Sequence, residues 1–273
     1  MKKNIMLIAL TILVPFVYPL SIGALTDGKS GNNEAADIIK KVDTVNNVTD
    51  LKMEMTMTII DKRDVKTKKK FTRIEKLDGN NDSKVLIRFL EPPDVKGTSF
   101  LTVEHTPGDD EMWVYFASMR KVRRIAISST DRKDQFMGSD FTYGDMNRKV
   151  SDYNYSFIKE EKLGPVNCYV IEEIPIDQNI KDNDGYSKKI EWISKDNYLV
   201  MKTEYYDLQK KLEKVTINSE PASLGNNKWT IKKYEIHNLL RNHKTIIDLD
   251  KIEVNQGIRD EMFSTNYLQR ASW

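Results

Sequence analysis

The chain has 273 residues, and its 43 lysine and arginine residues nearly balance its 41 aspartate and glutamate residues. The excess of two comes from Lys2 and Lys3, because residues 1–24 hold no acidic residue. The rest is neutral, which argues against a nucleic-acid-binding protein and against a strongly basic membrane-surface protein. A single cysteine, Cys168, excludes an intramolecular disulfide, and with only three histidines the sequence predicts no metal site.

Residues 1–24 have the composition of a signal peptide. Two lysines precede an almost entirely apolar run from Ile5 to Leu20, and the small residues from Ser21 to Ala24 offer a cleavage site. The rival interpretation is an uncleaved membrane anchor, since the run is nearly long enough to span a bilayer. Two prolines interrupt the run and polar residues follow it, so cleavage is favoured. We expect a soluble protein exported to the periplasm.

Residues 25–33 are small and polar and predict a flexible lead-in, and residues 34–273 predict a single domain. The domain opens with a short helix from Glu34 to Val45, whose apolar residues fall on one side. From Leu51 to Ile59 the apolar residues recur at every second position instead, which predicts a strand with one buried face.

This first strand carries a row of methionines, Met53, Met55 and Met57. We expect all three to point to the concave side of a curved sheet, with Glu54, Thr56 and Thr58 on the other side. Methionine is flexible and polarizable, and it suits surfaces that accept varied apolar partners. For any single methionine an ordinary core position is the better interpretation, but the row as a whole favours a deformable apolar cavity.

The rest of the chain repeats the strand pattern, with turn-forming residues between the segments. Helical stretches are expected near Asp131–Met146 and near Asp260–Leu268. The pattern predicts a mainly β protein with a few helices and one antiparallel sheet, which should curl and leave an inside to fill. The predicted strands after the first are Lys70–Leu77, Lys84–Leu90, Thr98–Glu104, Met112–Phe116, Lys121–Ile127, Tyr153–Lys159, Cys168–Ile174, Lys188–Ser194, Leu199–Tyr206, Lys211–Asn218, Trp229–His237 and Lys244–Val254.

No motif of a known catalytic site is present, whether a phosphate loop, a zinc-binding helix or a nucleophile elbow. His237 and His243 are best interpreted as structural histidines. Charged strand residues such as Arg88 and Glu191 are assigned to outer, solvent-facing positions. A basic cluster at residues 120–124, which includes Arg123 and Arg124, has two interpretations: a solvated sheet edge that discourages pairing with another sheet, or a contact for an anionic headgroup or a partner.

Four motifs in the middle of the chain are distinctive. They are Leu90–Leu101 (LEPPDVKGTSFL), Met112–Tyr115 (MWVY), Arg120–Ile125 (RKVRRI) and Gln135–Asp145 (QFMGSDFTYGD). Their sequences and their order resemble the outer-membrane lipoprotein-sorting protein family, the LolA-like group. The resemblance extends from about Asp50 to Arg270.

The resemblance implies an open, strongly curved antiparallel half-barrel, closed by a helical lid over an apolar cavity. It also implies a carrier of acyl chains without cofactor or catalysis. Gly138, Ser139 and Asp140 belong to the expected lid, where Ser139 and Asp140 could anchor a flap by hydrogen bonds to nearby backbone. The residues expected to bind acyl chains are Met53, Met55, Met57, Trp113, Tyr115, Phe136, Met137 and Phe141.

Two functional hypotheses follow. The first is a soluble periplasmic carrier that binds acyl chains of lipoproteins or lipids and moves them towards the outer membrane, with membrane-associated donor or acceptor proteins as partners. It predicts an apolar pocket without convergent titratable groups. The alternative is a periplasmic sensor or scaffold that binds a lipidated or misfolded protein and signals to a partner, which an exposed apolar patch outside the pocket would favour.

Overall fold

The computed structural model describes residues 28–270, except residues 81, 106, 107, 109, 126–129 and 147. The predicted signal peptide, residues 1–24, lies outside this part of the chain. Within it, no helix has both the length and the apolar character that crossing a membrane would require.

The first helix, α1 (Gly28–Thr44), begins six residues before the predicted Glu34. Residues 28–33, which the sequence assigns to a lead-in before the helix, therefore belong to the helix. Burial of Ala35, Ile38 and Ile39 against the sheet explains the difference. Once packing has formed the first turns, each further residue adds a hydrogen bond at little extra cost, so the helix extends beyond its apolar stretch.

All the predicted strands are present in one antiparallel sheet of 13 strands. Most observed bounds lie within a few residues of the predicted ones, because the alternation of apolar and polar residues marks each strand. The strands are β1 (Asp50–Ile60), β2 (Lys66–Leu77), β3 (Ser83–Glu91), β4 (Ser99–Val103), β5 (Glu111–Phe116), β6 (Lys121–Ile125), β7 (Tyr153–Leu163), β8 (Val166–Pro175), β9 (Tyr186–Ser194), β10 (Val200–Asp207), β11 (Leu212–Gly225), β12 (Lys228–Asn238) and β13 (His243–Val254).

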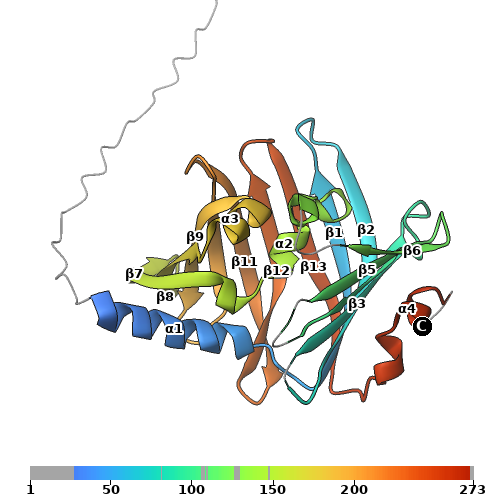
Figure 1. Cartoon of the computed structure of the whole chain (residues 1–273), viewed down its shortest axis with the longest axis horizontal. Coiled ribbons are helices and arrows are strands. Elements are labelled where there is room, and N and C mark those ends of the chain that lie inside the picture. Colours follow the sequence, from blue (N-terminus) through green and yellow to red (C-terminus); the bar gives the residue numbers. More distant parts are fainter. Residues whose placement is uncertain are drawn as a thin grey trace, which may run out of the picture.

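The first and last strands of the chain lie side by side in the middle of the sheet. Strands β1 to β6 run outwards to one edge, β7 to β13 return from the other edge, and β1 pairs with β13 in the middle. Figure 1 shows the resulting open, curved sheet, whose two edge strands do not pair with each other. The chain must therefore cross from β6 to β7, and it does so over the concave face. We call residues 130–152 the crossing segment.

The described residues of the crossing segment form short helical turns: η1 (Thr130–Lys133), η2 (Phe136–Gly138), α2 (Tyr143–Met146) and η3 (Val150–Asp152). The helical stretch predicted near Asp131–Met146 is therefore divided into separate short turns. Met137 and Gly138 have positive φ angles, of 52° and 74°, which end the helical turn. A further helix, α3 (Gln178–Asp184), joins β8 to β9 and was not predicted.

The convex face of β3 to β6 is covered by the C-terminal residues, which form η4 (Asp260–Met262) and α4 (Thr265–Leu268). Trp113 and Tyr115 pack here, beside Phe263 and Leu268. The prediction that Trp113 and Tyr115 line the cavity is therefore wrong. Side chains alternate along a strand, so on β5 it is Met112 and Val114 that face the concave side.

Arg88 holds the C-terminal segment in place. Its guanidinium donates hydrogen bonds to Oγ of Ser99 (3.0 Å) and to the carbonyl oxygens of Leu268 (3.0 Å) and Arg270. The residue is 5% exposed, so its assignment to a solvent-facing position is wrong. It does lie on the outer face, but α4 covers that face.

We expect Arg88→Met to lower the free energy of unfolding by about 1–3 kcal/mol, because buried carbonyl groups lose their donor. Urea denaturation measures the change. The matched control is Arg259→Met, which removes a solvent-exposed pair with Glu261 and should cost less than about 1 kcal/mol. If the free energy of unfolding falls equally in the two variants, Arg88 does not anchor the C-terminal segment.

Candidate functional site

A cavity of about 300 Å³ lies between the concave face and the crossing segment. Its walls come from strands near the centre of the sheet and from the crossing segment above them. The apolar residues that line it are Leu51, Met53, Met55, Phe71, Ile87, Phe136, Phe141, Met146, Tyr234 and Ile247. Arg73, Glu75 and Asp145 also reach the cavity, where Arg73 pairs with Glu75 (2.6 Å) and Asp145 pairs with Lys214, so titratable groups are present but are already paired within the protein.

The methionine row of β1 faces inwards as predicted. Met53, Met55 and Met57 are all buried on the concave side, while Glu54 is exposed. Met53 and Met55 line the cavity, and Met57 is packed into the core beside it. The register of β1 is therefore confirmed by the structure, although Thr58 on the opposite face is also buried.

The crossing segment contributes a set of large apolar side chains to the cavity. Phe136 is 3% exposed, and its ring centroid lies 4.9 Å from that of Phe100 and 5.9 Å from that of Phe89. Phe141 also lines the cavity. Met137 packs against the same core without lining the cavity, and its carbonyl oxygen accepts a hydrogen bond from Lys69 (2.6 Å).

A second, smaller cavity of about 100 Å³ lies next to the first. The two share Phe136 and Met146 of the crossing segment, together with Ile87 and Arg73 of the sheet. The smaller cavity reaches Arg148, Asp110 and Met112. Phe136 and Met146 therefore line both cavities on the concave face and lie between them.

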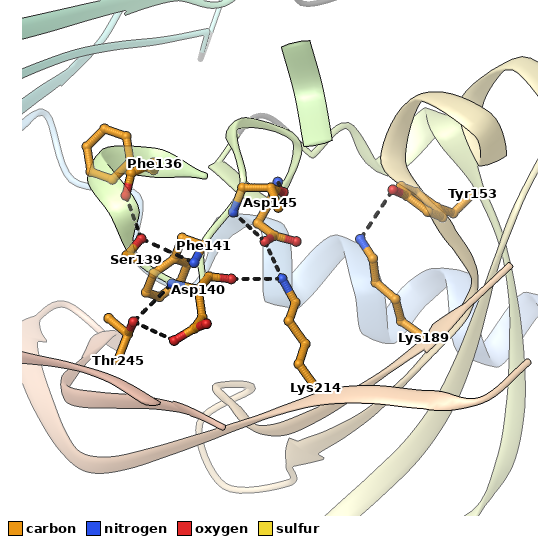
Figure 2. A network of polar contacts seen from close by, with 10 residues as sticks. Phe136, Ser139, Asp140, Phe141, Asp145, Tyr153, Lys189, Lys214 and Thr245 are labelled. Carbon is orange, nitrogen blue, oxygen red and sulfur yellow. Dashed lines mark hydrogen bonds and ion pairs between the residues drawn. The ribbon is translucent and has the colours of Figure 1, made fainter. Parts of the chain in front are cut away.

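Ser139 and Asp140 tie the crossing segment down (Figure 2). Oγ of Ser139 donates to the carbonyl oxygen of Phe136 (2.7 Å) and accepts from the backbone of Phe141 (3.2 Å), as the sequence predicts. Asp140 instead bonds to β13: its backbone donates to Thr245 (2.9 Å), and its carboxylate accepts from Thr245 (2.8 Å).

A ring nitrogen of His243 lies 2.8 Å from the Asp140 carboxylate, so this histidine has the structural role that the sequence predicts. We call the contacts of Asp140 with Thr245 and His243 the latch. All the groups of the latch are buried or nearly so. The latch fixes the crossing segment to the centre of the sheet.

A buried ion pair adds to the latch. Nζ of Lys214 on β11 lies 2.5 Å from the carboxylate of Asp145 and donates to the carbonyl oxygen of Asp140 (3.2 Å). Lys214 is 1% exposed, and its ammonium group lies 4.5 Å from the ring centre of Tyr205. Figure 2 shows this lysine rising from the sheet towards the crossing segment.

Beneath the crossing segment the concave face of β7 to β11 is polar, in contrast to that of β1 to β5. Where α1 packs on the same face, it carries apolar residues such as Ile171 and Ile193. Arg148 of the crossing segment pairs with the fully buried Glu173, and Lys189 donates to the hydroxyl group of Tyr153 (3.2 Å). Arg132 bonds to Asp184 (2.7 Å) at the end of α3. The crossing segment therefore rests with its apolar residues on one half of the sheet and its charged residues on the other.

Glu191 lies inside this polar half and not in solvent, contrary to the sequence interpretation. Burial and the neighbouring carboxylate of Glu173 raise the pKa of Glu191 to about 8. Burial lowers the pKa of Lys189. At neutral pH Glu191 therefore keeps its proton, which can form a hydrogen bond with Glu173.

We expect the free energy of unfolding to fall as the pH rises from about 4.5 to about 8. Above pH 4.5 the unfolded chain releases the Glu191 proton, whereas the folded protein holds it until about pH 8. Glu191→Gln should flatten this decline, by at most about 1.4 kcal/mol per pH unit. Denaturation at a series of pH values tests this. If the free energy of unfolding changes with pH in parallel in the unmodified protein and in Glu191→Gln, Glu191 ionises normally. Lys189, Arg148 and Glu173 are present in both proteins, so their contributions cancel.

Arg123 and Arg124 lie on β6, which is an edge strand, and both are exposed. Arg124 pairs with Glu111 (3.1 Å) on the neighbouring strand. This position agrees with the solvated-edge interpretation of the basic cluster. The two arginines lie far from the latch along the order of strands.

Solved structures share this architecture. A domain assigned to outer membrane lipoprotein sorting, from Vibrio parahaemolyticus, is 25% identical with a TM-score of 0.80, covering 88% of this chain and 100% of that one. A DUF1329 family protein from Desulfovibrio piger is 27% identical with a TM-score of 0.80, covering 87% and 99%. A LolA superfamily protein from Nitrosomonas europaea is 18% identical with a TM-score of 0.65, covering 85% and 98%, and it shows the fold alone.

A family model described as "Uncharacterized protein" matches residues 81–270, more than half of the chain. The chain belongs to this family. No curated protein matches it. The solved structures confirm the predicted resemblance to lipoprotein-sorting and LolA-like proteins, and with it the open curved half-barrel.

Proposed function

We propose that the protein is an exported carrier that binds acyl chains of lipids or lipoproteins in the cavity beneath the crossing segment. The observation that carries the proposal is the cavity itself, lined on the sheet by Met53 and Met55 and on the cover by Phe136 and Phe141. Such a lining offers an acyl chain an apolar and adaptable site. The likeness to a lipoprotein-sorting domain supports the same class of cargo.

The size of the cavity indicates how cargo would enter. A volume of 300 Å³ lies at the lower end of the range of about 300–1,000 Å³ found for ligand sites. A displacement of Phe136 and Met146 would join it to the second cavity, since both residues line both hollows. We infer that the crossing segment moves when cargo binds and that Gly138 is one point where its backbone can bend.

The latch gives the carrier a way to release cargo. Each methylene group that leaves water contributes about 0.8 kcal/mol, so a long chain alone would bind tightly. Displacing the crossing segment would strain or break contacts of Asp140 and Lys214, which offsets part of this gain. The polar contacts would thus set the affinity at a level from which transfer to a membrane-associated acceptor is feasible.

The proposed acyl-chain site comprises Met53, Met55, Phe136 and Phe141, which line the cavity, and Met57 and Met137, which pack in the core beside it. It omits Trp113 and Tyr115. Native mass spectrometry of the protein purified from the periplasm tests the proposal. We expect the protein to carry lipid that organic solvent releases, and the emptied protein to bind a fluorescent fatty acid. A protein that is empty as isolated and binds no probe would contradict a carrier function.

The sensor or scaffold hypothesis predicts an exposed apolar patch outside the cavity, and exposed leucines are present at Leu239 and Leu240. A protein that binds no acyl probe but retains a partner through these leucines would favour this second function. The basic residues around these leucines point to a different occupant, as argued below.

A further inference from the structure

Three hairpin turns stand side by side at one end of the sheet. They join β1 to β2 (residues 61–65), β12 to β13 (residues 239–242) and β10 to β11 (residues 208–211). The order β2-β1-β13-β12-β11-β10 makes these hairpins consecutive, and strands about 4.8 Å apart place neighbouring tips about 10 Å apart. Figure 1 shows the β1–β2 and β12–β13 turns at the top of the molecule. We call the three turns the rim.

The rim exposes large apolar side chains. Val65 and Leu239 are each 53% exposed, Leu240 is 47% exposed and Leu208 is 36% exposed. The leucine pair is not needed to form its turn, because the side chain of Asn238 accepts from the backbone of Arg241 (3.0 Å). Two adjacent exposed leucines at the tip of a hairpin are costly in water, so a contact that covers them is expected.

The rim and the first residues of β2 beside it are basic, although the chain beyond residue 24 is neutral. The β1–β2 turn (residues 61–65) holds two basic residues and two aspartates, and the first five residues of β2 add four lysines. Residues 208–211 hold two lysines and no acid, and residues 239–242 hold one arginine. In the part of the chain that the structure describes, no ion pair joins Lys62, Lys66 or Lys68 to a carboxylate. The carboxylates of Asp61 and Asp207 accept hydrogen bonds from the backbone of their own turns.

We propose that the rim docks on an anionic lipid surface. Apolar side chains ringed by lysines match the two parts of such a surface, because the acyl boundary takes the leucines and the negatively charged headgroups take the lysines. A neutral apolar protein surface would match the leucines alone. The proposal goes beyond cargo binding and holds whatever the cavity contains.

The rim is connected to the cover of the cavity. The β12–β13 turn leads directly into His243 and Thr245, which hold Asp140 in the latch. On the β1–β2 hairpin, Lys69 donates a hydrogen bond to the carbonyl oxygen of Met137. A molecule docked by the rim would therefore place the crossing segment next to the lipid surface, where cargo would enter or leave.

Vesicle co-sedimentation tests the proposal with the soluble protein recovered from expressing cells, after its N-terminal sequence has been determined. We expect binding to vesicles of phosphatidylcholine with phosphatidylglycerol, weaker binding at high salt, and little binding to phosphatidylcholine alone. Leu239→Ser with Leu240→Ser should weaken binding at least about tenfold. Lys62→Gln with Lys66→Gln should weaken it about fivefold for each lysine removed.

Matched controls lie away from the rim. Ile158 and Ile217 are exposed to a similar degree, at 45% and 44%, and Lys162 on β7 and Lys232 in the middle of β12 are exposed lysines. Ile158→Ser with Ile217→Ser, and Lys162→Gln with Lys232→Gln, should bind vesicles as the unmodified protein does. The proposal is overturned if the protein binds neither vesicle type, which would leave a protein partner as the occupant, or if rim and control variants lose binding equally.

Discussion

Replacing Lys214 with methionine should lower the free energy of unfolding by about 3–5 kcal/mol, because the change leaves the buried carboxylate of Asp145 without its cation. Burial alone would favour the protonated form of Asp145, but the charges of Lys214 and Lys189 outweigh it and lower its pKa. Urea denaturation followed by circular dichroism measures the loss. Hydrogen exchange should also become faster in residues 136–146, because the crossing segment loses a contact with β11.

Two controls separate the ion pair from a general packing effect. Lys214→Met combined with Asp145→Leu removes both charges, so most of the lost stability should return. Lys159→Met removes an exposed pair with Glu161 and should change stability by less than about 1 kcal/mol. If the double variant is as unstable as Lys214→Met, the uncompensated charge is not the cause.

Filling the cavity should abolish cargo binding without unfolding the protein. Ile247 is buried and lines the cavity, so Ile247→Trp places a larger apolar side chain in existing space. We expect the affinity for a fluorescent fatty acid to fall at least about tenfold, since the chain would lose several buried methylene groups. The free energy of unfolding should stay the same or rise, because a filled void restores packing contacts.

The neighbouring residue gives the matched control. Ile246 follows the alternation of β13 and points to the opposite face, so Ile246→Trp adds the same side chain outside the cavity. Its probe affinity should be that of the unmodified protein. Unchanged affinity in a folded Ile247→Trp protein would show that the acyl chain binds elsewhere.

Most of the sheet could be predicted from the sequence, because one buried face leaves a clear period of two, as in the methionine row of β1. The positions of Trp113 and Tyr115 could not be predicted in this way. Their strand is apolar at nearly every position, since the C-terminal residues cover its other face. The pattern alone does not say which side chains of such a strand point to the concave face of the sheet.

The polar half of the concave face also escaped prediction. Glu173, Lys189 and Glu191 alternate along strands like solvent-facing charges, and only the crossing segment turns them into a buried network. The partner of Glu173, Arg148, lies in the crossing segment, which follows no periodic pattern. Ser139 and Asp140 could be picked out by their place in the motif, but the bonds of Asp140 to Thr245 span more than a hundred residues.

Photo-crosslinking with a fatty acid that carries a diazirine on its chain tests the central claim most directly. Peptide mass spectrometry then locates the attachment sites. The carrier account predicts crosslinks in β1 around Met53 and Met55, and in the crossing segment around Phe141 and Met146. Ile247→Trp should suppress these crosslinks. Attachment confined to the convex face or to the exposed turns, with none inside the cavity, would contradict the account.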